Sequence, residues 1–313
     1  MRSKWQNPAT AKLSKNLISQ MCRLVFGADD YKTAQPLAGG RSHQNYLISL
    51  ASGQQVVLRV SGNQQSLGKQ YALAQKLWLK LPVPRFLSQP QAANGKRFFA
   101  FMEFKPGQRL ANIEALPVAE QAQLGFELGE YLALIHSQTF KHAGAFSSDL
   151  KLDQNYDISP NGLSEIFANC LSQASKNGHI DGKLAQTYRH SFAEKIQILD
   201  QWPHHHCLIH ADLNEDNILH YDGHISAILD WEFALSGHPA LDFGKFTRTP
   251  YSHCPIFTEN LCDNYYLTHK NLPVNWPEIA QIVDLLAWAE FLSRPQVTED
   301  IKTSALGKLR GNL

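Results

Sequence analysis

The spacing of apolar residues changes abruptly near Lys105-Pro106-Gly107, and this change constrains the fold more than any other feature of the chain. Before it, short apolar runs such as NYLISL and VVLRV are separated by turn residues, which is typical of an antiparallel sheet. The pairs Ser52-Gly53 and Asn94-Gly95 stand between strand-like runs, where hairpin turns are expected. One helix-like segment, LGKQYALAQKLWLKL, is inserted among these strands.

After this change, helical spacing of apolar residues dominates the chain and predicts helices over 117–137, 161–178, 181–199, 254–270 and 277–292. The same spacing predicts a leading helix over roughly 9–27, before the strands. Only the strand-rich segment 207–233 interrupts this helical part. A chain of 313 residues is longer than most single domains. We therefore expect an α+β protein with a sheet lobe over 1–104 and a helical lobe over 105–313.

Composition excludes several classes of partner. Lys and Arg total 29 against 28 for Asp and Glu, so the chain lacks the basic field that holds nucleic acid or an anionic membrane. The N-terminal stretch has no unbroken apolar core, and no later stretch is long enough to span a bilayer, which predicts a cytoplasmic protein. The five cysteines are scattered and include no C-x-x-C pair, as expected for reduced thiols.

The segment CLIHADLNEDNILHYDGHISAILDWEF, residues 207–233, carries the polar residues that suggest chemistry. It is interpreted as a strand, a loop, and then a hairpin that turns at Asp222-Gly223. If the hairpin pairs evenly about this turn, Asn217 lies opposite Ile228 and Asp230 lies just beyond. Both side chains would then face the loop that carries Asp212. Three oxygen-bearing side chains gathered in this way suit a hard cation such as Mg²⁺ bound to phosphate oxygens.

This arrangement resembles a known enzyme pattern. H-x-D-L-x-x-x-N followed by a hairpin and another Asp is the kinase catalytic-loop and metal-loop pattern. With DWE and SGHPALDF, the segment resembles the aminoglycoside phosphotransferase and choline kinase family, and the resemblance extends from about Leu37 to Pro295. It implies a bilobal protein-kinase-like fold, with an antiparallel-sheet N-lobe and a mainly helical C-lobe. It also implies an enzyme that moves the γ-phosphate of ATP or GTP to a hydroxyl group of a small molecule.

The resemblance assigns roles to the polar residues of the segment. Asp212 would orient the substrate hydroxyl and accept its proton, and Asn217 and Asp230 would hold Mg²⁺ on the phosphates. His210 would brace the loop through backbone hydrogen bonds. Asp242, in HPALDF, would be a structural carboxylate that supports the loop.

A kinase also needs groups that bind the nucleotide phosphates. In LAGGRSHQNYLI, Gly39 and Gly40 would let the backbone approach phosphate oxygens, with Ser42 and His43 at the turn. The full G-x-G-x-x-G pattern is absent, which counts against a dinucleotide-binding fold. Arg59, in VVLRV, stands where kinases commonly place a lysine, and its fork suits two phosphate oxygens. Gln70 stands where the family has a glutamate to pair with this cation, so that opposite charge is missing here.

The adenine base is expected to meet the linker FMEFKPG. By resemblance to the hinge of these kinases, backbone groups of about Glu103 to Lys105, including Phe104, would contact the base edge. Met102 would lie behind the base.

The acceptor pocket is expected in the helical half. Many family members take cationic acceptors such as aminoglycosides, choline or thiamine, which carboxylates and aromatic faces bind. The candidates here are Asp212, Glu232, Trp231 and the face Asp284, Trp288, Glu290 and Phe291. Asp284, Trp288 and Phe291 fit an ordinary packing stripe equally well. The modest acidity of this half gives little support for a polycationic acceptor.

Two other functions stay open from the residues. A nucleotide-binding pseudokinase is suggested by Gln70, although Asp212, Asn217 and Asp230 are intact. A metal-dependent hydrolase could use His210 and Asp212 together with the histidines at 204–206. Adjacent histidines on a strand point to opposite faces, so they cannot all meet one ion.

Overall fold

A computed structural model of the chain describes residues 13–27, 31–37, 43–93, 97–203 and 205–313. The chain divides into two compact units. The first, which we call the sheet unit, comprises Met1–Leu110, Phe146–Lys151 and Glu215–Phe233. The second, the helical unit, comprises Ala111–Ala145, Leu152–Asn214 and Ala234–Leu313. The division of the sequence into lobes at residues 104 and 105 stays a prediction.

The sheet unit contains a five-stranded antiparallel sheet in the order β1-β2-β3-β5-β4. Its strands are β1 (Tyr31–Leu37), β2 (His43–Leu50), β3 (Gln55–Ser61), β4 (Gln91–Ala93) and β5 (Arg97–Glu103). The predicted hairpin at Ser52-Gly53 is confirmed, because β2 and β3 pair on either side of it and Gly53 has a φ of 88°. β4 and β5 also pair, and the predicted turn residues between them, Asn94-Gly95, lie outside the described residues.

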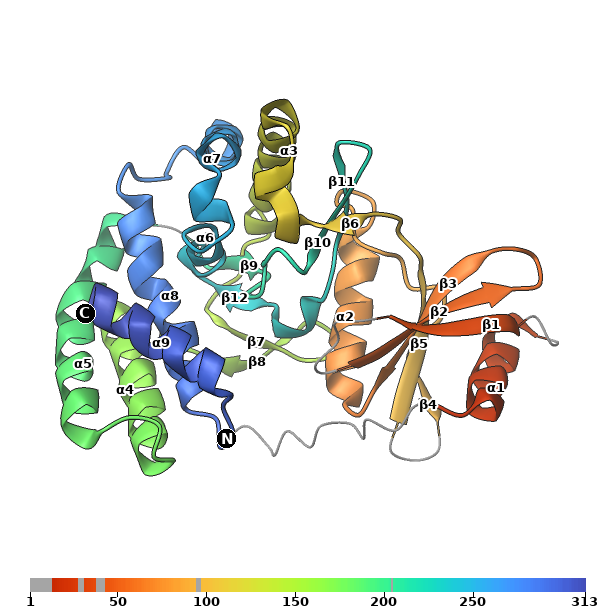
Figure 1. Ribbon diagram of the computed structural model, residues 1–313, viewed down its shortest axis with the longest axis horizontal. Coiled ribbons are helices and arrows are strands. Elements are labelled where there is room, and N and C mark those ends of the chain that lie inside the picture. The colour runs from red at the N-terminus through yellow and green to blue at the C-terminus, as the bar shows by residue number, and fades with distance from the viewer. Residues whose placement is uncertain (1–12, 28–30, 38–42, 94–96, 204) are drawn as a thin grey trace. The chain divides into compact units, whose positions relative to one another are not determined.

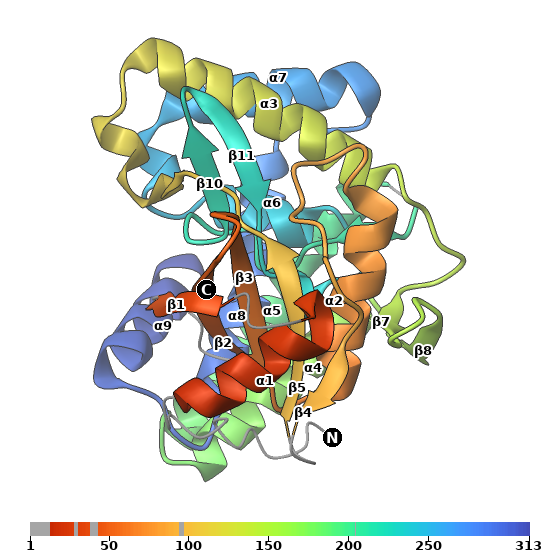
Figure 2. The same cartoon turned by 90° about the vertical axis from the view of Figure 1, so that its right-hand side faces the viewer.

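A helix packs on each face of this sheet (Figures 1 and 2). Helix α1 (Lys15–Phe26) packs on the face that carries Ile48, Leu58 and Phe101. It begins later than the predicted 9–27 range, because Ser14 is its N-cap and accepts the backbone N–H of Leu17. Helix α2 (Gln64–Leu77) packs against β3 and β5. Side chains alternate along a strand, so Arg59 lies on the opposite face of β3 from Leu58 and its neighbours in the α1 core.

The predicted hairpin at Asp222-Gly223 is present as β10 (Ile218–Tyr221) and β11 (His224–Ile228). Its predicted register is wrong by one residue: Ile218 pairs with Ile228, and the carbonyl of Asn217 accepts the N–H of Leu229. A bulge causes this shift, because it places one extra residue on β11. That residue, Ser226, donates a 2.7 Å hydrogen bond to the Pro106 carbonyl. A third strand, β6 (Gln108–Arg109), pairs with β10.

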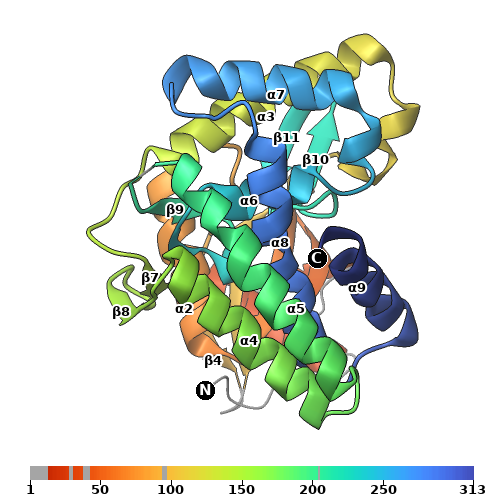
Figure 3. The ribbon, with the colours of Figure 1, turned by 90° about the vertical axis from the view of Figure 1, so that its left-hand side faces the viewer.

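The helical unit is built from paired helices. Figure 3 shows α3 beside α7 and α4 beside α5, while α8 packs against α4, α6 and α9. These helices are α3 (Val118–His136), α4 (Pro160–Lys176), α5 (Gly182–Lys195), α6 (Ala240–Phe246), α7 (Pro255–Thr268), α8 (Trp276–Leu292) and α9 (Glu299–Asn312). The five helices predicted after residue 105 are all present. Two more, α6 and α9, were not predicted, since α6 is short and α9 is largely polar.

The prediction that only segment 207–233 carries strands in the second part of the chain is wrong. A small sheet has the order β8-β7-β12-β9, with strands β7 (Gly144–Phe146), β8 (Leu152–Asn155), β9 (Cys207–Ile209) and β12 (Leu235–Gly237). Strands this short carry almost no periodic signal. Four 3₁₀ segments complete the regular structure of the described residues: η1 (Leu110–Ala115), η2 (Ile196–Gln201), η3 (Trp231–Phe233) and η4 (Tyr251–His253). None of the helices described is both long and apolar enough to cross a lipid bilayer.

Two glycines allow α3 and α7 to pack closely, and this generates a stability prediction. A Cβ at Gly125 would lie 2.2 Å from the Phe257 carbonyl oxygen, and one at Gly129 would lie 2.3 Å from that of Leu261. We expect Gly125→Ala or Gly129→Ala to lower the free energy of unfolding by about 1–3 kcal/mol, because the helices must separate. Chemical denaturation measures this change.

The matched control is Gly307→Ala in α9, where a Cβ would meet nothing within 4 Å. That substitution should raise the free energy of unfolding by about 0.5–1 kcal/mol, since alanine favours the helix. Equal effects at Gly125 and Gly307 would contradict the close packing of α3 on α7.

Candidate active site

A buried carboxylate holds the loop that follows β9 in the helical unit. Asp242, in the first turn of α6, accepts the backbone N–H of His210 at 2.9 Å and that of Ala211 at 2.7 Å. Ala211 has a φ of 64°, an unfavourable left-handed conformation for a residue with a side chain. The two hydrogen bonds stabilise this turn of the backbone. Asp242 thus supports the loop, as the sequence predicted.

Asp242 is itself fully buried and has charged or polar partners on its other side. His136 Nε2 lies 3.2 Å from Asp242 Oδ2, and His136 Nδ1 lies 3.0 Å from the Tyr265 hydroxyl. Burial raises the pKa of Asp242, but the hydrogen bond and charge of His136 and the groups of His210 outweigh it and lower this pKa below its ordinary value. Asp242 is therefore an ionised acceptor at neutral pH.

The loop presents the side chain of Asp212. Its backbone N–H lies 3.3 Å from His210 Nδ1, so His210 contacts the loop backbone, as predicted. Asp212 Oδ1 accepts a 2.9 Å hydrogen bond from the Asn214 amide and lies 3.7 Å from Lys245 Nζ. Lys245 is buried, and this burial lowers its pKa, as does the nearby charge of Arg248. Asp212 is thus an aspartate with a cation beside one of its oxygens.

In the sheet unit, Arg59 and Asp230 form an ion pair. Arg59 Nη2 lies 2.5 Å from Asp230 Oδ1, and the Arg59 side chain is only 6 % exposed. Asp230, a predicted site residue, has a φ of 61° and thus a left-handed conformation like that of Ala211. The Nε of Arg59 is buried and has no hydrogen-bond partner among the described residues.

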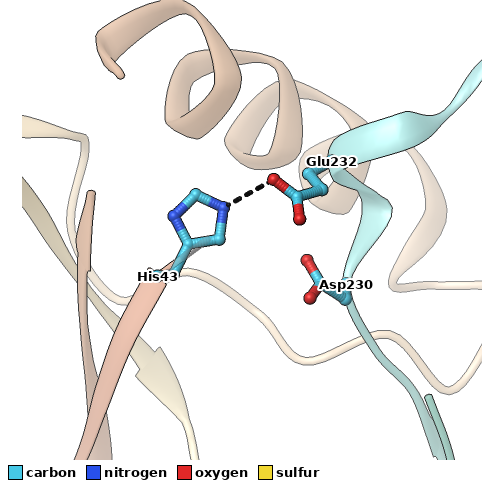
Figure 4. A group of neighbouring side chains, drawn as sticks. All are labelled: His43, Asp230 and Glu232. Carbon is cyan, nitrogen blue, oxygen red and sulfur yellow. Dashed lines mark ion pairs between the residues drawn. The ribbon is translucent and has the colours of Figure 1, made fainter. Parts of the chain in front are cut away.

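Gln70 contacts His43 rather than serving as the partner of Arg59. Its Nε2 lies 3.1 Å from His43 Nε2, which is also 3.2 Å from Glu232 Oε2. Figure 4 shows His43 on β2 facing Glu232, with Asp230 next to that carboxylate. Burial lowers the pKa of His43, and the charge of Arg59 lowers it further. Glu232, predicted to bind the acceptor, is therefore engaged within the sheet unit, and its role stays a prediction.

The predicted hinge follows the end of β5. The backbone N–H of Glu103 donates to the Arg85 carbonyl at 2.8 Å, and its carboxylate accepts from Lys105 Nζ at 3.0 Å. Met102 is half-buried in β5 opposite Val57. The predicted phosphate-binding residues Gly39, Gly40 and Ser42 lie outside the described residues. Their assignment stays a prediction.

The remaining predicted residues lie in separate surroundings. Glu290 on α8 is bound by Arg294 one turn later, at 2.8 Å. Asn217 lies immediately before β10 and belongs to the sheet unit, as does Asp230, whereas His210 and Asp212 belong to the helical unit.

The histidine cluster imagined for a metal hydrolase does not form among the described residues. His210 is fully buried and contacts the backbone of its own loop. His205 is exposed, and His204 lies outside the described residues. The group of possible metal ligands that the described residues do form is His43, Asp230 and Glu232.

Sequence reasoning missed three residues that contact the predicted site. His43 was expected in a turn, but it begins β2 and contacts Glu232. His136 and Lys245 were not considered, although each lies in a helix and is buried. A buried histidine or lysine within an apolar helical pattern is the signal that could have found them, because such groups are rarely buried without a partner.

Comparisons with known proteins agree with this architecture. A model of the phosphotransferase enzyme family matches residues 33–280. No curated protein sequence matches the chain.

Solved structures with the same fold include two nucleotide complexes. One is a thermostable mutant of aminoglycoside phosphotransferase APH(4)-Ia with AMP-PNP and hygromycin B, with 17% identity, 94% of this chain and 97% of that chain covered, and a TM-score of 0.71. Another is the streptomycin-ATP-APH(2″)-IIa ternary complex, with 15% identity, 96% and 97% covered, and a TM-score of 0.69. The predicted α+β, protein-kinase-like fold is confirmed.

The buried carboxylate leads to a prediction about pH. Because the pKa of Asp242 is lower in the folded chain, its contribution to stability is complete above the unfolded pKa of about 3.9 and is lost as the pH falls through the folded pKa. We expect Asp242→Asn to lower the free energy of unfolding at neutral pH by about 1–3 kcal/mol, because one loop N–H loses its acceptor. The variant should also lose less stability than the parent below pH about 4. Denaturation at several pH values measures both.

Asp216→Asn is the control, since this carboxylate in the same loop is 61 % exposed. It should leave the stability and its pH dependence close to those of the parent protein. A pH dependence that is unchanged in Asp242→Asn would show that this carboxylate does not carry the effect.

Proposed function

Because the chain belongs to the phosphotransferase enzyme family and is a small-molecule kinase, we propose that it moves the γ-phosphate of ATP to a hydroxyl group of a small molecule, with Mg²⁺ as cofactor. The observation that carries the proposal is the pairing of Arg59 with Asp230. It places a buried, permanent cation beside an aspartate suited to a metal, as transfer of a phosphate group requires.

The contacts of Arg59 fit a phosphate ligand. One terminal nitrogen binds Asp230, while the buried Nε has no partner among the described residues. Buried donors are nearly always satisfied, so an unpaired one indicates a group that binds there. A phosphate oxygen would accept from Nε, and the guanidinium would keep its ion pair with Asp230. Arg59 thus needs no glutamate on α2 to be held before the nucleotide arrives.

The proposed metal ligands fit Mg²⁺ in their chemistry. Asn217 and Asp230 offer amide and carboxylate oxygens, which this hard cation prefers. His43 offers a nitrogen close by, but its Nε2 already contacts Glu232 and Gln70. We therefore assign Mg²⁺ to Asn217 and Asp230. When bound, the ion would neutralise charge on the phosphate oxygens.

Recognition of the adenine base is assigned to the backbone after β5. The N–H of Glu103 is already bound by Arg85, so we assign the base edge to the backbone groups of Phe104 and Lys105. The ion pair between Lys105 and Glu103 would steady this linker. Met102 would contact the base from behind, and Gly39, Gly40 and Ser42 would cover the phosphates.

In the proposed mechanism, the oxygen of the acceptor hydroxyl attacks the γ-phosphorus of ATP while Asp212 accepts the hydroxyl proton. The bond between the γ-phosphorus and the β–γ bridging oxygen breaks, and ADP leaves. The two hydrogen bonds that Asp242 accepts hold the backbone before Asp212, and His210 contacts the backbone N–H of Asp212 itself. The Asn214 amide orients one carboxylate oxygen. Lys245 Nζ lies 3.7 Å from the same oxygen and would help to hold it in place.

The first functional prediction concerns Asp212. Asp212→Ala should lower kcat on any accepted substrate by about 10²–10⁴-fold, because a positioned general base is lost. The Kd for ATP should change little, and isothermal titration measures it. The matched control is Asp216→Ala, an exposed aspartate of the same loop, which should keep near-parental kcat. Turnover by Asp212→Ala equal to that of the control would refute the role of Asp212.

A second functional prediction concerns Arg59. Arg59→Ala should weaken Mg²⁺-ATP binding by about tenfold or more, because a charge-assisted hydrogen bond to phosphate is lost. Arg59→Lys should retain part of the affinity. Lys32→Ala, on β1 of the same sheet, is the control and should bind ATP normally. An unchanged Kd for both ATP and GTP in Arg59→Ala would rule out the proposed phosphate contact.

A further inference from the structure

A small polar cavity lies within the helical unit, where α6, α8 and α9 meet. Its volume is about 80 Å³. This is well below the roughly 300–1,000 Å³ of pockets that enclose a whole drug-sized ligand. It can therefore hold one compact chemical group rather than a complete sugar ring system. Its lining residues are Thr247, Arg248, Gln281, Asp284, Leu285, Trp288, Lys308 and Asn312.

The one carboxylate of this lining is already engaged. Arg248 Nε lies 2.6 Å from Asp284 Oδ2, and Arg248 Nη2 lies 2.6 Å from Asp284 Oδ1. The Trp288 indole N–H also donates to Asp284 Oδ2, at 3.0 Å. Asp284 thus has three donors and little capacity left for a ligand. It holds Arg248 in place instead of presenting a negative charge to the cavity.

Positively charged donors of the cavity keep capacity for a ligand. The third nitrogen of Arg248, Nη1, has no partner among the described residues, and neither has the ammonium of exposed Lys308. The guanidinium carbon of Arg248 also lies over the Trp288 ring, 4.3 Å from its centroid. A guanidinium fixed in this way loses little freedom when it binds an anion. The chemistry of the cavity therefore selects a compact anionic group.

Lys245 connects this cavity to the proposed catalytic base. Its Nζ lies 3.7 Å from Asp212 Oδ1, and the charges of Arg248 and Asp284 both act on its pKa. Lys245 lies on a closely packed part of α6, because α6 and α8 approach each other at Gly244, where a Cβ would lie 3.0 Å from Asp284 Cβ. Arg248, which lines the cavity, follows Lys245 by three residues just after the end of α6, so the same segment reaches both the cavity and Asp212.

We propose that the acceptor of this kinase carries a carboxylate or phosphate group, which binds Arg248 and Lys308 in this cavity while a hydroxyl of the same molecule faces Asp212. The proposal rests on the proposed function. It departs from the cationic acceptors that the family resemblance implies. Most of the cavity residues, from Gln281 to Asn312, follow the stretch 33–280 that matches the family model.

Four probes on one sugar scaffold test the proposal: D-glucose, D-glucosamine, D-glucuronate and D-glucose 6-phosphate. Each is titrated into the full-length protein without nucleotide. The indole N–H signal of Trp288, identified by its loss in Trp288→Phe, reports binding in the cavity by NMR. We expect the two anionic sugars to bind at least about tenfold more tightly than glucose and glucosamine, since each forms charge-assisted hydrogen bonds. The tighter of the two identifies carboxylate or phosphate as the preferred group.

Charge-removing variants then test the residues. Lys308→Gln should weaken binding of the anionic sugars by about threefold or more, because one cation is lost. Lys302→Gln, the same change on α9 outside the cavity lining, should leave it unchanged. Arg248→Gln alone would leave Asp284 buried without its partner, so the double variant Arg248→Gln with Asp284→Asn replaces the ion pair by two amides. It should stay folded by circular dichroism and lose the preference for anions.

The outcomes separate this inference from the proposed function. Equal or tighter binding of glucose or glucosamine, or no shift of the Trp288 signal with either anion, overturns the anionic subsite. Phosphate transfer from Mg²⁺-ATP to glucosamine without any preference for anions would also overturn it and leave the kinase function standing. Anion binding at Trp288 in a protein that neither binds nor turns over ATP would support the subsite and reject the ATP-dependent function.

Discussion

The buried carboxylate of Asp242 is the interaction on which the proposed catalytic loop depends. It accepts hydrogen bonds from two successive backbone N–H groups, one of which belongs to a left-handed residue. On its other side it contacts the His136 ring nitrogen Nε2. A buried charge is costly unless it is paired and hydrogen-bonded. Here every partner is supplied by a neighbouring element of the same unit. The conformation of the loop is thereby tied to the packing of α3, β9 and α6.

The sheet unit satisfies its buried charges in a different way. Many kinases pair the strand cation with a glutamate of the following helix, and Gln70 cannot supply that charge. Asp230 supplies it directly to Arg59, and the amide of Gln70 contacts His43 instead. A neutral residue on α2 is therefore compatible with a held cation. The departure of Gln70 from the family pattern does not point to a protein without activity.

The helical unit combines a general scaffold with a local charge pattern of its own. The paired helices and the loop of Asp212 fall within the stretch that matches the family. The cavity beside them takes its positive character from Arg248 and from Lys308 on the last helix. Fold and acceptor are thus separable properties, because a site is set by a few side chains that the fold positions. The acceptor class has to be argued from these side chains.

The sequence alone determined the secondary structure of the long elements and was enough to propose Asp212, Asn217 and Asp230 as site residues, because apolar period and motif spacing are local properties. It could not determine the register of the β10–β11 hairpin, since the bulged residue Ser226 is hydrogen-bonded to the Pro106 carbonyl, 120 residues away along the chain. Nor could it reveal that Arg59 pairs with Asp230, or that Asp284 neutralises one cation of the cavity and leaves others for a ligand. Those contacts join residues distant in sequence, and only the tertiary structure brings them within hydrogen-bonding distance.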